Sequence, residues 1–170
     1  MTSEVQPPGF PAAQEPRRLQ LRGLHHITLI CTSLERSVAF YRDVMGLRLV
    51  KQTVNHDDRS AKHFYFVDAV GSPGTVITCM EYPQMEEGVV GRGSTHHFAL
   101  SVETVEELDA WKEYLESRGV GCTERLDRTW FSSIYLRDPD GHVIEIATRG
   151  PGFTLDESPE QLGTRFVQPS

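Results

Sequence analysis

Two histidines and a glutamate are the residues of this sequence best suited to chemistry. His26 lies in a strand-like run, 24–31, and His97 lies at the matching place in a second run, 95–102, 71 residues later. Glu145 lies in a third run, between two isoleucines. Two imidazoles and one carboxylate form a facial set that suits Fe(II), because coordination positions stay open for substrate and dioxygen. Such a site requires elements that bring the three side chains together.

A repeated unit of the sequence supplies those elements. In each copy, alternation of apolar and polar residues predicts a strand, and a Thr-x-x-Glu capping box then opens an amphipathic helix that ends at a glycine. The capping boxes predict helices beginning at Thr32 and at Thr104. The expected strands are 25–31, 47–54, 62–67 and 75–80 in the first copy, and 95–102, 122–126, 129–137 and 142–148 in the second.

The repeat predicts an α+β fold, in which two tandem βαβββ modules form a cupped, barrel-like mixed sheet with the helices outside. The proline-rich N-terminus is typical of a disordered tail, and the glycine-rich segment between the copies is typical of a linker. The expected organisation is a tail at 1–20, a first module at 21–83, a linker at 84–94, a second module at 95–149 and a C-terminal extension at 150–170.

Composition excludes several classes of protein. The net charge of −7, without a cluster of lysine and arginine, argues against binding to nucleic acid. Three scattered cysteines are too few for a disulfide framework, and we expect them to be reduced core residues. No apolar run is long enough for a membrane span, and the N-terminus lacks the order of a secretory signal. We therefore expect a cytoplasmic protein with no membrane or nucleic-acid partner.

Aligning the last strands of the two copies places Thr78 at the position equivalent to Glu145. The four repeat-equivalent positions thus hold three good metal ligands and one poor one, Thr78. A single histidine on a strand is more often structural than a ligand, but its recurrence at equivalent positions favours the metal site. His56, His63 and His142 have no such support, and we expect them to be surface or lining residues.

The same residues carry a resemblance to a known family. Two βαβββ units with His26, His97 and Glu145 at these places resemble the vicinal oxygen chelate superfamily, which includes glyoxalase I, bleomycin-resistance proteins and extradiol ring-cleaving dioxygenases. Five segments look like the hydroquinone-type ring-cleaving dioxygenases: Gly-Leu-His-His-Ile-Thr at 23–28, Gly-Leu-Arg-Leu-Val-Lys-Gln-Thr-Val-Asn at 46–55, Gly-Ser-Pro-Gly-Thr at 71–75, Ser-Ile-Tyr-Leu-Arg-Asp-Pro-Asp-Gly at 133–141 and Ile-Ala-Thr-Arg-Gly-Pro-Gly-Phe-Thr at 146–154.

The resemblance implies a dioxygenase that opens para-dihydroxylated aromatic rings, with a small aromatic diol and O2 as substrates. It implies Fe(II), with Mn(II) or another divalent metal as the alternative, bound by His26, His97 and Glu145. Its catalytic residues fall on His96, Tyr135 and Arg128, where Arg128 would hold a substrate oxygen and the other two would handle protons. Its substrate-binding residues fall on His25 and Thr28, and Thr78 joins them from the repeat alignment.

Alternatives remain at this stage. Members of the hydroquinone group are about twice this length, so the chain resembles their first and last modules joined directly and is expected to form a homodimer. The metal then lies either within one chain or between His26 of one subunit and the other two ligands of its partner. A glyoxalase-like isomerase or lyase would want a fourth ligand at Thr78, and a sequestering protein of the bleomycin-resistance type would need no metal. Ring substituents, para-diol against catechol, and the pathway stay open.

Overall fold

The first module forms one four-stranded sheet covered by one helix. The structure is a computed structural model that describes residues 19–167, so most of the predicted tail lies outside the described residues. The strand order is β1-β4-β3-β2, with β1 and β4 parallel and the other pairs antiparallel. In chain order its elements are β1 (His26–Cys31), α1 (Leu34–Tyr41), β2 (Arg48–Val54), β3 (Lys62–Val67) and β4 (Val76–Glu81).

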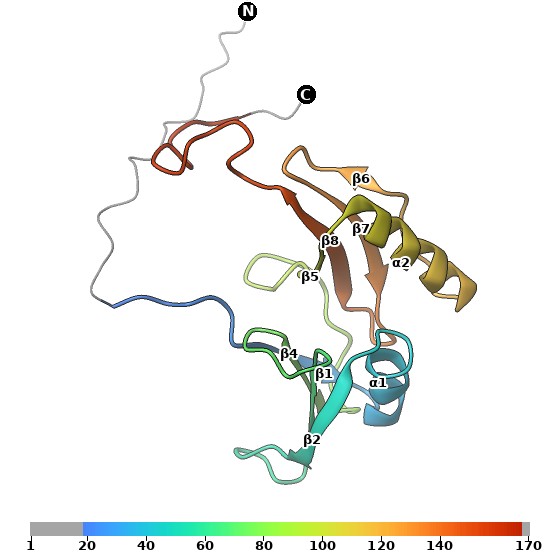
Figure 1. Ribbon diagram of the computed structural model, residues 1–170. Helices are drawn as coiled ribbons and strands as arrows, with labels where there is room; N and C mark the ends of the chain where they lie inside the picture. The colour runs from blue at the N-terminus through green and yellow to red at the C-terminus, as the bar shows by residue number, and fades with distance from the viewer. Residues whose placement is uncertain (1–18, 168–170) are drawn as a thin grey trace, which may run out of the picture.

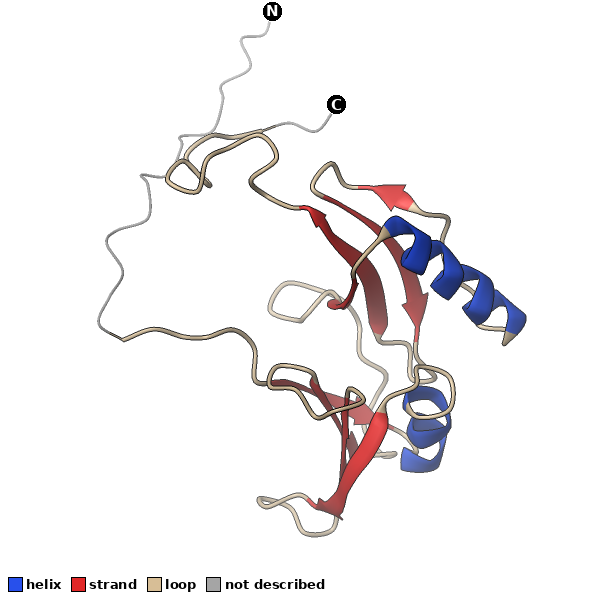
Figure 2. Ribbon diagram, in the orientation of Figure 1, coloured by secondary structure: helices blue, strands red, loops and turns tan. Residues whose placement is uncertain are grey.

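The second module repeats this arrangement. Its sheet has the order β5-β8-β7-β6, again with the first and last strands parallel. In Figures 1 and 2 each helix covers one face of its own sheet, and the two sheets are cupped rather than closed into a barrel. The predicted α+β fold of two βαβββ modules is therefore confirmed. The elements are β5 (Phe98–Val102), α2 (Val105–Ser117), β6 (Leu126–Asp127), β7 (Phe131–Arg137) and β8 (Val143–Pro151).

The helix starts test the predicted capping boxes. Thr104 caps α2 and accepts a backbone hydrogen bond in the first turn, as expected. The predicted cap of α1, Thr32, is wrong, because Ser33 holds the cap position and accepts from the backbone N–H of Arg36. The hydroxyl of Thr32 instead donates to Oδ1 of Asp140 at 2.6 Å. A carboxylate of the second module thus competes for this side chain, and no local pattern contains that acceptor.

Strand alternation sends apolar side chains to the faces that the helices cover. In β1, Leu29 and Cys31 are buried, whereas His26 and Thr28 are exposed on the opposite face, as the period of two of a strand requires. The cysteines form no disulfide. The two helices pack on one continuous apolar core, which includes Tyr41, Phe66, Ile77, Cys79, Leu108, Leu115, Ile134, Leu136, Ile144 and Ile146.

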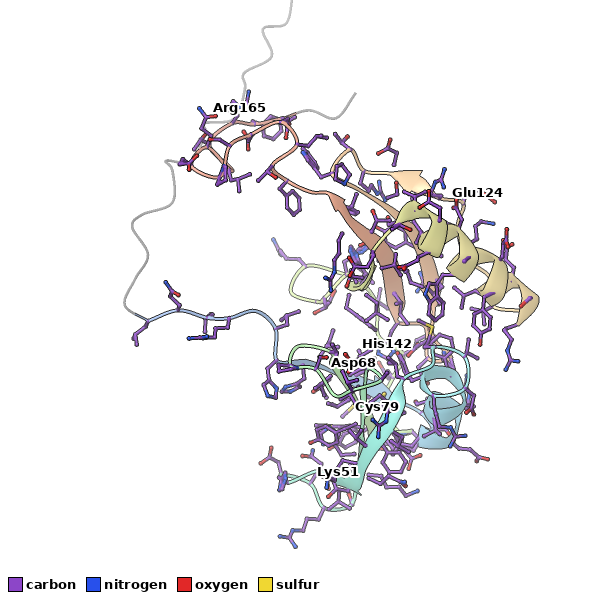
Figure 3. All side chains as sticks on the ribbon, viewed as in Figure 1. Lys51, Asp68, Cys79, Glu124, His142 and Arg165 are labelled. Atoms are coloured by element: carbon purple, nitrogen blue, oxygen red, sulfur yellow. The ribbon has the colours of Figure 1, made fainter. Side chains whose placement is uncertain are left out.

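The turn between β7 and β8 joins the two modules. The buried hydroxyl of Tyr41 on α1 donates to Oδ2 of Asp138 at 2.8 Å, and the Arg36 guanidinium donates to the carbonyl of Pro139 at 2.6 Å. The ring of His142, labelled in Figure 3, contacts the same Asp138 carboxylate at 2.9 Å. We call Tyr41, Asp138 and His142 the junction triad. It fixes the turn of the second module against the first helix.

Each sheet has two edge strands, so the edges of β1, β2, β5 and β6 are unpaired in the described part of the chain. Strands β1 and β5 are each the first strand of their sheet order, and neither pairs with the other. A cavity of about 830 Å³ lies along β1 and β5, lined by Thr28, His96 and His97 but by neither Tyr135 nor Glu145.

Neither α1 nor α2, the helices of residues 19–167, is long and apolar enough to cross a membrane.

Candidate functional site

A cluster of interacting polar side chains lies on the sheet of the second module, around Glu145. The Nε2 atom of His97 lies 3.0 Å from Oε2 of Glu145, and the Tyr135 hydroxyl donates to Oε1 of Glu145 at 2.7 Å. The Glu145 side chain is 4% exposed, against 33% for His97. Burial of a carboxylate is costly unless hydrogen bonds compensate, and here both oxygens have a partner.

Strand register explains why these three residues meet. Tyr135 pairs with Glu145 across the antiparallel strands β7 and β8, and Ala99 pairs with Glu145 across the parallel strands β5 and β8. Paired residues point to the same face of a sheet, and so do residues two apart on one strand. His97 stands two residues before Ala99, immediately before β5 begins at Phe98, and its ring reaches the carboxylate from this end of the strand.

Arg128 brings a positive charge to the rim of this cluster. Its guanidinium lies 5.6 Å from the centre of the Tyr135 ring, and its Nη2 atom lies 3.5 Å from the Tyr135 hydroxyl. Asp127, its neighbour, instead accepts from the backbone N–H of Thr129, which has a positive φ of 70°. Within residues 19–167, Arg128 has no carboxylate at ion-pair distance, so its charge is available to a ligand.

Each of the two predicted histidine pairs is held by a contact between its rings. Nδ1 of His96 lies 2.8 Å from Nδ1 of His97, and Nδ1 of His25 lies 3.0 Å from Nδ1 of His26. Neighbouring residues of a regular strand point to opposite faces, but β1 begins only at His26 and β5 only at Phe98. His25 therefore precedes β1, and both His96 and His97 precede β5. The contact through Nδ1 also leaves Nε2 of His97 directed at the carboxylate.

A second polar cluster lies on the first module and includes two predicted substrate-binding residues. The Thr78 hydroxyl donates to Thr28 Oγ1 at 3.0 Å and lies 2.8 Å from Nε2 of His63. Nδ1 of His63 lies 3.2 Å from the Tyr65 hydroxyl. His63 is only 5% exposed, so of the two places expected for it, surface or pocket lining, the surface is wrong. Burial, with the nearby rings of His26 and His56, lowers the pKa of His63.

The predicted site residues thus fall into two groups. His96, His97, Arg128, Tyr135 and Glu145 lie together on the second module. The others lie on the first module, and within residues 19–167 of one chain no group of three histidine, cysteine, aspartate or glutamate side chains can hold a metal. The remaining predicted residues, all on the first module, are His25, His26, Thr28 and Thr78.

The donor atoms of the second module fit a divalent metal in part. Nitrogen and oxygen ligands bind such ions at about 2.0–2.2 Å, so an imidazole and a carboxylate in contact can share one ion. The 3.0 Å between Nε2 of His97 and Oε2 of Glu145 satisfies this requirement. The pair forms two thirds of the predicted ligand set, and a third ligand must come from elsewhere.

Two members of the polar cluster on the first module, His63 and Tyr65, were missed by the sequence reasoning. Tyr65 pairs with Thr78 as Tyr135 pairs with Glu145, so Tyr65 and Tyr135 are equivalent in the repeat. The alignment of β4 with β8 was used to find Thr78. The same alignment applied to β3 and β7 would have identified Tyr65 and, two residues earlier, His63.

Comparisons of sequence and of structure show which known proteins this chain is similar to. A sequence model described as Glyoxalase/Bleomycin resistance protein/Dioxygenase superfamily matches residues 23–146. The protein named "Putative ring-cleaving dioxygenase MhqE" of Bacillus subtilis is 39% identical over 63% of this chain and 35% of its own length. The chlorohydroquinone/hydroquinone 1,2-dioxygenase of Sphingobium indicum is 35% identical over 88% of this chain and 45% of its own length.

A solved structure is also similar. The crystal structure of a "putative dioxygenase" from Bacillus subtilis matches with a TM-score of 0.70 and 37% identity, over 77% of this chain and 42% of that one. The chain therefore spans less than half of the length of each of these three proteins.

Proposed function

Because the chain belongs to the glyoxalase/bleomycin resistance protein/dioxygenase superfamily, we propose that it is an Fe(II)-dependent dioxygenase that opens a hydroquinone-type aromatic ring with O2. The observation that carries this proposal is the buried carboxylate of Glu145 in contact with His97, Tyr135 and, through the tyrosine, Arg128. Relatives named as ring-cleaving and hydroquinone dioxygenases support the reaction class.

The metal in this proposal lies between two copies of the chain. His97 and Glu145 supply two ligands, and His26, exposed on the equivalent strand of the first module, supplies the third from a second copy. The unpaired edges of β1 and β5 support this arrangement, because repeat-equivalent edges can pair between two copies of one chain. Bound there, Fe(II) would supply the redox chemistry and the open coordination positions that ring opening by O2 requires.

The surrounding residues would bind the diol and handle its protons. Arg128 is always cationic and unpaired with a carboxylate in the described chain, so it would hold a phenolic oxygen or an anionic ring substituent. Tyr135 and His96 reach the ligand residues directly and would take or return the hydroxyl protons. His25 and Thr28 would complete the pocket from the first module of the other copy.

Thr78 favours oxygen chemistry over isomerisation. A glyoxalase-like isomerase would place a carboxylate ligand and base at this position, but the Thr78 hydroxyl is fully buried and bonded to Thr28 and His63. The two repeat-equivalent positions therefore provide one carboxylate instead of two. That leaves the three-ligand set, which keeps positions open for substrate and O2.

The test is oxygen uptake by the Fe(II)-reconstituted chain, prepared without oxygen and offered hydroquinones and catechols. We expect uptake with hydroquinones and ring-opened products by mass spectrometry. Absence of uptake with both substrate classes defeats the proposal, and uptake with catechols alone defeats only the para-diol assignment.

The control for this assay is the metal content. We expect His97→Ala to bind less iron than the wild type and to lose oxygen uptake. A wild-type chain that retains no iron after reconstitution, and that binds aromatic compounds equally well with and without this substitution, would be a sequestering protein.

A further inference from the structure

A hydrogen-bonded row of four polar side chains crosses the sheet of the first module. The proposed reaction gives no role to two of them, Tyr65 and His63. The row runs from the Tyr65 hydroxyl to Nδ1 of His63, at 3.2 Å. It continues from Nε2 of His63 to Thr78 Oγ1 at 2.8 Å, and from Thr78 Oγ1 to Thr28 Oγ1 at 3.0 Å. His63 and Thr78 are buried, whereas Thr28 is exposed at the end of the row.

The hydrogen bonds in this row all run in one direction. The Thr78 hydroxyl donates to Thr28, and a hydroxyl has only one hydrogen, so Thr78 must accept from Nε2–H of His63. A neutral imidazole carries one N–H, so Nδ1 of His63 must in turn accept from the Tyr65 hydroxyl. Burial favours the neutral ring, since it penalises the imidazolium.

This direction determines what Thr28 can offer to a ligand. Its oxygen already accepts from Thr78, and its own hydrogen has no acceptor among residues 19–167. Thr28 lies on the uncovered face of β1, two residues from His26 on that same face. Thr28 therefore presents a hydrogen-bond donor beside a proposed metal ligand.

The second module does not repeat this row of hydrogen-bonded side chains. Register places Ser133 at the position of His63 and Ala99 at the position of Thr28. The buried hydroxyl of Ser133 has no hydrogen-bond partner within the described part of the chain. The row of four hydrogen-bonded side chains is thus a property of the first module and not a requirement of the βαβββ fold.

We propose that Tyr65, His63 and Thr78 are positioning residues that fix Thr28 as a hydrogen-bond donor to an acceptor oxygen of the aromatic substrate. This inference rests on the proposed function and adds to it the polarity of one substrate contact. The site would favour a ring oxygen that accepts, such as an ionised hydroxyl or a carboxylate substituent, at the place that Thr28 reaches.

Steady-state kinetics of oxygen uptake with hydroquinone test this role. Thr78→Val removes the hydroxyl that links His63 to Thr28 at nearly constant side-chain volume. It should raise KM by about tenfold, the loss of one modest hydrogen bond, with kcat within about twofold. Thr78→Ser keeps a hydroxyl and should return KM to within about threefold of the wild type. Ser133→Ala, at the equivalent position, is the control and should change neither constant. An unchanged KM in Thr78→Val, or a Thr78→Ser as impaired as Thr78→Val, would overturn the proposal.

A second measurement does not depend on turnover. The ¹⁵N spectrum of the metal-free wild-type protein should show His63 neutral at pH 7 with its hydrogen on Nε2, assigned by its loss in His63→Gln. The opposite tautomer or a charged ring would overturn the donor-to-acceptor direction that we infer for these hydrogen bonds. A wild type that consumes no oxygen defeats the dioxygenase proposal. The spectrum then still decides whether the hydrogen bonds run from Tyr65 to Thr28.

Discussion

Glu145 is a carboxylate whose two oxygens have different tasks. Oε2 contacts His97 and is the oxygen that can turn to a metal, whereas Oε1 accepts from the Tyr135 hydroxyl at 2.7 Å. Hydrogen bonds to ligating carboxylates orient them, and loss of such a bond typically lowers metal affinity by about 10- to 100-fold. In the proposed site, the tyrosine would therefore act on the metal as well as on the substrate.

Tyr135→Phe should weaken Fe(II) binding by about 10- to 100-fold, because it removes the group that orients Glu145. Titration of the chain with Fe(II) without oxygen, followed by calorimetry, measures this change. Tyr114→Phe is the matched control, since that tyrosine lies on α2 and is 39% exposed. Equal affinities for Tyr135→Phe and the wild type would contradict the orienting role.

The junction triad is the contact by which a turn of one module is held on a helix of the other. Burial alone would raise the pKa of Asp138, but hydrogen bonds from His142 and Tyr41 outweigh burial and hold that pKa below its ordinary value. The hydrogen bond to Asp138 likewise raises the pKa of His142. Asp138 and His142 thus stabilise each other in their charged forms.

Tyr41→Phe should lower the free energy of unfolding by about 1.5–3 kcal/mol, the usual contribution of a hydrogen bond to a charged group. The ring stays in the core, where Tyr41 is fully buried, and only the hydroxyl that Asp138 accepts is lost. Urea unfolding gives the difference. Tyr114→Phe should change this free energy by less than about 0.5 kcal/mol, as surface substitutions usually do. A loss of similar size in both variants would argue against the junction contact.

The His142 contact also predicts how stability depends on pH. Because the folded pKa of His142 is raised, its contribution is complete below the ordinary value of about 6.5 and is lost as pH rises through the folded value. Because the folded pKa of Asp138 is lowered, its contribution is complete above about 4 and is lost as pH falls through the folded value. The difference in Tm between wild type and His142→Gln should therefore be largest between about pH 4 and 6.5. A difference that stays flat from pH 5 to pH 9 would refute this linkage.

Local patterns predicted those elements whose environment depends on near neighbours. The strand predicted at 62–67 is β3, and alternation along β1 correctly separated the buried from the exposed face. The strand predicted at 122–126 was largely wrong, because β6 covers only Leu126–Asp127. There the Thr123 side chain, not a backbone carbonyl, accepts from the backbone N–H of Tyr135. A side chain that replaces a ladder group leaves no trace in an alternation pattern.

The candidate site could likewise be predicted only where its residues lie on adjacent strands of one module. Repeat equivalence identified His97 and Glu145, and adjacent strands bring them to 3.0 Å. The distance between the modules was not predictable, because contacts such as that of Tyr41 with Asp138 join residues far apart in sequence. His63 was missed because the repeat alignment was applied only to the last strands, β4 and β8, and not to β3 and β7.

In the whole molecule, the separation of His26 from His97 and Glu145 leads to a complementation test. His26→Ala and Glu145→Ala should each be inactive alone. In a mixture with random exchange of subunits, half of the dimers are mixed and each contains one intact site, so about one quarter of wild-type oxygen uptake should return. Unfolding and refolding the mixture allows the exchange. A metal site contained within one chain would give no recovery.

The unpaired edges of β1 and β5 have a thermodynamic consequence beyond geometry. If each metal ion has ligands from two chains, then the ion binds only the assembled pair, and metal affinity and chain association become linked equilibria. A chelator would then weaken the association, and dilution of the protein would release iron. The amount of iron bound per chain would depend on protein concentration as well as on the concentration of free metal.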